Sequence, residues 1–130
     1  MIKKISQVIV MVENYDKAIN WYSEKLGFEL HRDIPFGEGQ RWVSMLLPDD
    51  KGVELALVRV DSQKKLDSVG NQTADNVFLV VETDDCKGDY EKLKAKGVVF
   101  HSQPEQMTRG IEVIFEDLYG NRINLLQAVE

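Results

Sequence analysis

The sequence consists of two similar halves, and this internal repeat constrains the fold more than any other feature. Strand patterns, helix patterns and helix-ending glycines recur at a spacing of 69 or 70 residues. The matched positions are Val12 with Val81, Gly27 with Gly97, Phe28 with Val98, His31 with His101, and Pro35 with Pro104. Such a period indicates two copies of one supersecondary unit.

Hydrophobic periodicity predicts the same element order in each half. The first half has strand patterns at 5–12, 28–33, 41–47 and 53–60, and a helix at 15–26 with Asn14 as its N-cap. The second half has strand patterns at 76–81, 98–101, 110–116 and 122–129, and a helix between Asp84 and Gly97 whose buried stripe includes Cys86. Both halves are therefore expected to be βαβββ units.

The expected fold class is α+β, with two tandem βαβββ repeats that form curved mixed sheets around a cleft and carry their helices on the outside. We expect one domain over 1–130, with a first repeat at about 1–60, a linker at 61–73 and a second repeat at about 74–130. The linker is expected because this stretch has almost no apolar residues. A chain of 130 residues is the usual size of a single domain.

Composition excludes several classes of function. The net charge of −6 and the absence of a basic cluster argue against nucleic-acid binding, which needs a concentrated positive field. No stretch approaches the roughly 18 apolar residues of a membrane span. A single cysteine, Cys86, permits neither an internal disulfide nor a thiolate zinc cluster. We therefore expect a cytoplasmic protein without a membrane or nucleic-acid partner.

Strand alternation selects four polar residues on otherwise apolar strands. If Val8, Val10 and Val12 pack under the helix, alternate positions face the other side of the sheet. The polar residues selected in this way are Gln7, Glu54, Asn76 and Asn124. They also correspond through the repeat, Gln7 with Asn76 and Glu54 with Asn124.

Aromatic, basic and imidazole side chains give further candidates, each with an ordinary structural alternative. Phe36, Trp42 and Phe78 form either an aromatic wall for a ligand or normal core packing. Arg41 and Arg109 begin corresponding strands and either meet an anionic ligand or form surface salt bridges. The two histidines, His31 and His101, lie on second strands and are interpreted as surface residues.

Two motifs resemble one known family. The segment 12–30 is similar to the opening helix signature of the vicinal oxygen chelate superfamily, which includes glyoxalase I, bleomycin-resistance proteins and extradiol dioxygenases. The segment 116–125 resembles the acidic turn and glycine that close the family's domain. The resemblance covers essentially the whole chain, and it specifies the superfamily strongly and the reaction weakly.

The resemblance implies a four-strand metal position, which this sequence fills with an unusual set of residues. The family positions map onto Gln7, Glu54, Asn76 and Asn124. Gln7 and Glu54 are acceptable ligands, but Asn76 stands where a His is expected and Asn124 where a Glu is expected. Because neutral amides bind divalent transition ions weakly, we expect no metal ligand set, although a divalent metal stays open.

An alternative interpretation of these four positions is a satisfied polar network. In that network Glu54 accepts hydrogen bonds from Gln7 or Asn124, or pairs with Arg122 or Arg41. A buried carboxylate requires partners of this kind.

The leading functional hypothesis is a glyoxalase/bleomycin-resistance-like protein that binds a small organic molecule without metal. The residues expected to bind substrate are Gln7, Trp42, Asn76, Phe78 and Asn124, and Glu54 is the candidate catalytic residue. The sequence pI near 5.0 favours a cationic ligand. The alternatives are a divalent-metal-dependent lyase, isomerase or dioxygenase, and a partner-binding subunit. The resemblance also implies a homodimer.

Overall fold

The computed structural model describes residues 1–129, apart from the side chains of Asp50, Lys51 and Lys64. Glu130, the last residue of the expected second repeat, lies outside the described residues. The chain divides into two compact units, Met1–Val69 and Gly70–Glu130. Each unit is a βαβββ module with one four-stranded mixed sheet, as predicted.

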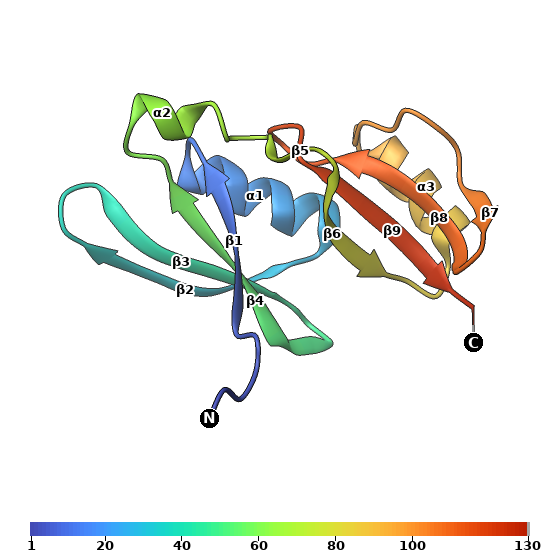
Figure 1. The fold of residues 1–130 in the computed structure, drawn as a ribbon, viewed down its shortest axis with the longest axis horizontal. Helices are drawn as coiled ribbons and strands as arrows, with labels where there is room; N and C mark the ends of the chain where they lie inside the picture. Colours follow the sequence, from blue (N-terminus) through green and yellow to red (C-terminus); the bar gives the residue numbers. More distant parts are fainter. Residues whose placement is uncertain (130) are drawn as a thin grey trace. The chain divides into compact units, whose positions relative to one another are not determined.

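The first unit contains a sheet with the strand order β1-β4-β3-β2 (Figure 1). Its elements are β1 (Gln7–Val12), α1 (Tyr15–Leu26), β2 (Glu29–Phe36), β3 (Gln40–Leu47), β4 (Asp50–Arg59) and the short α2 (Gln63–Leu66). β1 pairs with β4 in parallel, and the other pairs are antiparallel. This order places β1 beside β4, although the paired residues Gln7 and Glu54 are 47 positions apart in the sequence, because α1 carries the chain across the sheet.

The second unit repeats this arrangement with the strand order β6-β9-β8-β7. Its elements are β5 (Gln72–Asp75), β6 (Val77–Glu82), α3 (Cys86–Ala95), β7 (Glu105–Met107), β8 (Gly110–Glu116) and β9 (Arg122–Ala128). β6 pairs with β9 in parallel, as β1 does with β4. The duplicated topology predicted from the 70-residue period is confirmed.

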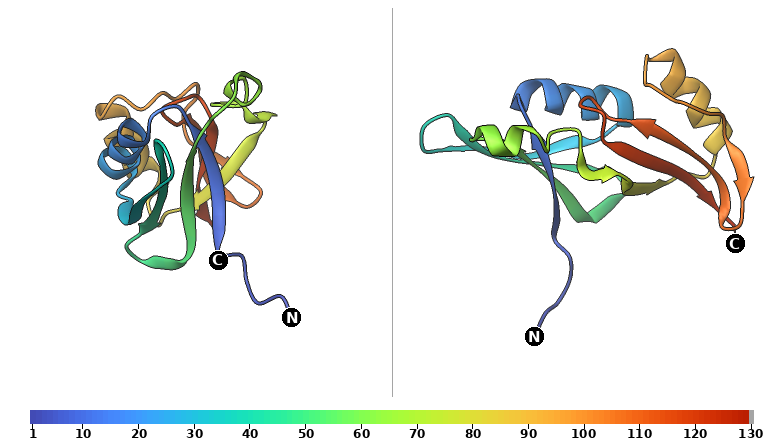
Figure 2. Two further views of the ribbon diagram at one scale, coloured as in Figure 1. Left: turned by 90° about the vertical axis from the view of Figure 1, so that its left-hand side faces the viewer. Right: turned by 45° about the horizontal axis from the view of Figure 1, so that its top comes forward.

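Helix α1 begins and ends where its sequence signals predict. Asn14 caps it by accepting a hydrogen bond from the Lys17 amide at 2.9 Å, and Gly27 ends it with a φ of 80°. The helix covers one face of the first sheet (Figure 2), with Tyr15, Ala18 and Tyr22 buried. The buried strand residues below it are Val10, Val12, Val43, Met45, Leu55 and Leu57.

Helix α3 builds the second core in the same way. Cys86, Tyr90 and Leu93 are buried on its inner face, as the helical stripe in the sequence predicts. The strand residues of this core include Val113, Phe115, Ile123 and Leu125. Each unit therefore encloses its own apolar core between one helix and one face of one sheet.

One local prediction is corrected by the structure. Residues 98–101 form no regular strand: Phe100 makes an isolated bridge to Phe115, and the edge strand is β7 instead. The Phe100 ring packs against Tyr90 and Phe115, so side-chain packing holds this segment in place of a backbone ladder. The expected linker at 61–73 contains α2 and the start of β5.

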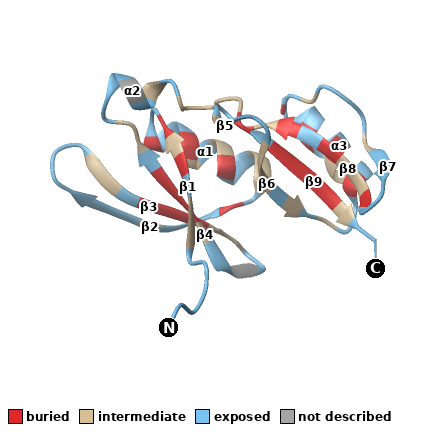
Figure 3. Ribbon diagram, viewed as in Figure 1, coloured by how far each residue is buried: buried red, intermediate tan, exposed pale blue. Residues whose placement is uncertain are grey.

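The edge strand β2 is the most exposed part of the first sheet. Almost all of its residues are exposed on both faces, as the pale blue of β2 in Figure 3 shows. The exposed β2 edge adjoins the polar cluster around Glu54.

Within the described residues, no helix is long and apolar enough to cross a membrane.

Candidate functional site

The face of the first sheet that lies opposite α1 is called here the open face. Strand alternation and the observed register place Gln7, Arg32, Ile34, Trp42, Ser44 and Glu54 on it. Its polar residues come from all four strands of the sheet and converge on one carboxylate. The open face therefore has a polar centre, as the alternation in the sequence predicts.

Glu54 is the centre of this cluster, with a side chain that is 15% exposed. Its neighbour across the parallel pair, Gln7, donates from Nε2 to Glu54 Oε2 at 3.4 Å. The Ser44 hydroxyl donates to Glu54 Oε1 at 2.8 Å. Both carboxylate oxygens thus accept a hydrogen bond, so the satisfied network proposed from the sequence exists around Glu54.

Two basic side chains, His31 and Arg32, complete the cluster. His31 Nε2 lies 3.5 Å from Glu54 Oε1, and Arg32 Nε lies 3.7 Å from the same oxygen. Consecutive residues on a regular strand point to opposite faces, so two neighbours around one carboxylate need a local irregularity. The structure supplies one.

A β-bulge in β2 brings both basic residues to Glu54. Leu30 pairs with Met45 and Arg32 pairs with Ser44, so β2 uses one more residue than β3 over this step. His31 is the extra residue, and a bulge of this kind redirects the side chains around it. His31 is nevertheless exposed, as the sequence pattern predicts, and no sequence signal marks the bulge.

The arginines expected beside Glu54 have other partners. Arg41 binds Asp33 through two hydrogen bonds, at 3.0 and 2.7 Å, and also contacts Asp16. Arg122 donates to the backbone carbonyl of Asp75. Arg109 pairs with Glu112, so Arg41 and Arg109 both form the surface salt bridges that the sequence analysis gave as their ordinary alternative.

The environment of Glu54 keeps its carboxyl group ionised. Burial raises the pKa of Glu54. The hydrogen bonds from Ser44 and Gln7 and the charges of Arg32 and His31 lower the pKa by a larger amount, so it lies below its ordinary value. A carboxylate with this pKa carries a full charge at neutral pH. It accepts hydrogen bonds well and accepts a proton poorly.

Exposed apolar side chains surround the polar centre. Trp42 is 43% exposed and Phe36 is 59% exposed, and Ile34 pairs in register with Trp42. Ile9 and Val58 are exposed on β1 and β4. The Arg32 guanidinium lies over the Trp42 ring, with Cζ 4.6 Å from the ring centroid. Large exposed apolar groups gathered around a polar centre are typical of a binding surface.

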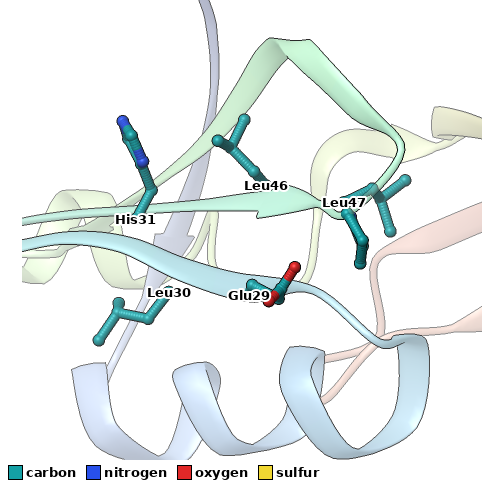
Figure 4. A pocket seen from close by; sticks show the side chains of 6 residues that line it. Glu29, Leu30, His31, Leu46 and Leu47 are labelled. Carbon is teal, nitrogen blue, oxygen red and sulfur yellow. The ribbon is translucent and has the colours of Figure 1, made fainter.

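A small pocket lies at one end of the β2–β3 pair. It has a volume of about 200 Å³ and is lined by Glu29, Leu30, His31, Leu46, Leu47 and Pro48. Figure 4 shows His31 and Leu46 projecting away from α1, whereas Leu30 points toward the helix. His31 therefore belongs both to the pocket and to the Glu54 cluster.

The candidate residues of the second unit are arranged differently. Asn76 is exposed and precedes β6, while Asn124 is buried on β9 opposite Val80. Asn124 donates to Glu112 at 3.4 Å, and its Oδ1 has no hydrogen-bond partner among the described residues. Phe78 is half-buried on β6. The strand pair thus does not align Asn76 with Asn124 as it aligns Gln7 with Glu54, because the residue opposite Asn124 is Val80, four positions after Asn76.

The residues around Glu54 suit a divalent metal ion poorly. They provide the carboxylate of Glu54, the amide of Gln7 and the imidazole of His31, but the Arg32 cation lies 3.7 Å from Glu54 Oε1 and competes with a metal ion for that oxygen. In the part of the chain that the structure describes, no group of three or more His, Cys, Asp or Glu side chains is placed to hold a metal.

Comparisons with known proteins agree on one family. The model of the Glyoxalase/Bleomycin resistance protein/Dioxygenase superfamily matches residues 4–125. An uncharacterised protein of Shewanella frigidimarina is 38% identical over 128 residues, which cover 98% of this chain and 95% of the relative.

Solved structures with the same fold include two with more than a quarter of their residues identical. UcmS2 has a TM-score of 0.86 and 29% identity, and the match covers 98% of this chain and 100% of UcmS2. TnmS3, an antibiotic-binding protein from Streptomyces sp. CB03234, has a TM-score of 0.81 and 28% identity, with 98% of each chain covered.

Proposed function

Because the chain belongs to the glyoxalase/bleomycin resistance protein/dioxygenase superfamily, we propose that it binds a small organic molecule on the open face without a metal ion. The observation that carries this proposal is the combination of a hydrogen-bonded Glu54 with exposed apolar side chains around it. The antibiotic-binding function of the structural neighbour TnmS3 supports the same class of ligand.

The apolar part of the open face would supply most of the binding free energy. Covering about 150 Å² of apolar surface is worth about 4 kcal/mol at 25 cal/mol per Å². Trp42 and Phe36 offer rigid aromatic surface, which loses little conformational entropy when a ligand covers it. The polar centre would then orient the ligand, with Gln7 and His31 offering hydrogen bonds.

The state of Glu54 favours binding over acid–base catalysis. A general base works best when its pKa lies near the operating pH. The pKa of Glu54 lies below its ordinary value because its hydrogen bonds and neighbouring charges outweigh its burial. We therefore propose that Glu54 anchors the polar centre rather than moving a proton.

A divalent-metal-dependent lyase, isomerase or dioxygenase is the second candidate. It is favoured by one observation, the side-by-side placement of Gln7 and Glu54 on β1 and β4. Titration with nickel, zinc, iron and manganese, followed by a thermal scan, separates the two candidates. A tight site gives about 4 kcal/mol of stabilisation at a thousandfold excess over its dissociation constant. Stabilisation that is lost in Glu54→Gln would support the metalloenzyme.

Binding on the open face is tested with a neutral aromatic probe, naphthylmethanol, and backbone amide NMR. We expect chemical-shift changes on β2, β3 and β4 in the wild type, and about tenfold weaker binding in Trp42→Ala. Met107→Ala, which removes an exposed apolar side chain from β7, is the matched control and should bind normally. Equal affinity of the wild type and Trp42→Ala would contradict the proposal.

The proposal extends to assembly and location. We propose a homodimer, because exposed apolar side chains such as Leu30 and Ile34 line the β2 edge. We also propose a cytoplasmic protein, in which the free, buried Cys86 stays reduced.

A further inference from the structure

The guanidinium group of Arg32 contacts Glu54 and Trp42, but its two terminal nitrogens have no partner in the part of the chain that the structure describes. Its Nε faces Glu54 Oε1 at 3.7 Å, and its Cζ lies 4.6 Å from the centroid of the Trp42 ring. Among the described residues, the two terminal nitrogens form no ion pair or hydrogen bond, and the side chain is 39% exposed. These nitrogens are therefore available on the open face.

Such an arrangement matches the requirements of a receptor for a carboxylate. The two terminal nitrogens of an arginine form a planar fork that binds both oxygens of a carboxylate in parallel. Glu54 and the Trp42 ring restrict the orientation of this fork before any ligand arrives, which reduces the entropy lost on binding.

The charge of Glu54 does not cancel this preference. Its two oxygens already accept hydrogen bonds from Ser44 and Gln7, and two basic side chains lie within 4 Å of it. The chain as a whole has a net charge of −6, so a cationic ligand is favoured by the average field alone. On the open face, where the ligand would bind, the positive charge of the Arg32 guanidinium locally outweighs the negative net charge of the chain.

We infer that the open face selects aromatic or otherwise apolar carboxylates, with Arg32 as the residue that determines this specificity. The carboxylate binds the terminal nitrogens of Arg32, and the apolar body of the ligand covers Ile34, Phe36 and Trp42 on the same face. This inference rests on the proposed function and replaces the cationic ligand suggested by the acidic pI.

Three naphthalene probes of different charge test the inference: the anion naphthoate, the neutral and nearly isosteric naphthamide, and the cation naphthylmethylammonium. Calorimetric titration of the full chain should show that naphthoate binds about tenfold or more tightly than naphthamide, and that naphthylmethylammonium binds most weakly. Raising the salt concentration should reduce the naphthoate preference, since part of it is electrostatic.

Variants of two arginines assign the preference to one residue. Arg32→Gln should bind naphthoate and naphthamide equally, and Arg32→Lys should keep only part of the preference because an ammonium has no planar fork. Arg109→Gln removes an equal charge from an exposed arginine of the second unit and should behave as the wild type does. A thermal scan of each variant verifies that it is folded.

The outcomes separate this inference from the proposed function. If all three probes bind with equal affinity, or if the naphthoate preference survives in Arg32→Gln, the carboxylate inference is wrong while small-molecule binding stands. If none of the three probes binds the wild type, the proposed function itself fails. Arg32→Lys keeps the test valid if Arg32→Gln does not fold.

Discussion

The side chains around Glu54 stabilise its negative charge. The contribution of this charge to the stability of the fold therefore depends on pH and can be measured. The pKa of the folded-state carboxyl is lowered, so its contribution to stability is fully present above the ordinary pKa and is lost as the pH falls through the lowered value. Glu54→Gln should therefore lower the free energy of unfolding by about 1–2 kcal/mol at about pH 7, and the difference from the wild type should shrink toward about pH 3.

Urea unfolding curves recorded across this pH range measure the effect. Glu105→Gln, an exposed residue on β7, is the control and should change stability little at any pH. A difference between Glu54→Gln and the wild type that stays constant with pH would show that the charge of Glu54 does not stabilise the fold.

Cys86 is expected to be chemically inert in the folded protein. Burial raises the pKa of its thiol, as do the nearby carboxylates of Asp89, Asp85 and Glu112, so little thiolate forms at neutral pH. An aromatic disulfide reagent such as DTNB should react slowly with the native protein and rapidly after unfolding in denaturant. Rapid stoichiometric reaction of the native protein would contradict the buried position.

At the scale of elements, the turns depend on glycines for two different reasons. Gly27 ends α1 at a φ of 80° with open space around it, so Gly27→Ala should cost only the backbone strain of about 1–2 kcal/mol. Gly110 has a φ of 145°, and a Cβ added there would also clash with the backbone oxygen of Gln127, at 2.1 Å. Gly110→Ala should therefore destabilise the protein more than Gly27→Ala does.

Thermal or chemical unfolding of the two alanine variants measures this order. Gly27→Asn provides the matched control, because asparagine adopts the left-handed conformation more readily than alanine. Its stability should lie between those of the wild type and Gly27→Ala. A Gly110→Ala variant as stable as Gly27→Ala would show that the β8–β9 pair opens easily at this point.

At the scale of the whole molecule, the exposed β2 edge predicts self-association. Sedimentation equilibrium at micromolar concentration should show a dimer, and Leu30→Lys should shift the equilibrium toward the monomer because a charge blocks an apolar contact on this edge. Lys substitution at Val99, an exposed apolar position of the second unit, is the control. A wild-type monomer at this concentration would refute the homodimer.

The sequence by itself determined the elements and their duplication. The bounds of α1, its cap at Asn14 and the buried stripe of α3 follow from local interactions, which short-range patterns record. The 70-residue period predicts the βαβββ topology of both units, and alternation places Gln7 and Glu54 on the same face of the sheet. These features depend on residues that are close in sequence or equivalent by repetition.

Only the tertiary structure decided how the candidate site is completed. The bulge at His31 brings His31 and Arg32 to Glu54, whereas the sequence analysis had suggested Arg41 or Arg122. The register of the β6–β9 pair likewise sets Val80, and not Asn76, opposite Asn124. Strand register and bulges are fixed by the packing of side chains from distant segments, and a shift of one residue exchanges the two faces of a strand. For this reason the pattern of the sequence identified the carboxylate but not the cations around it.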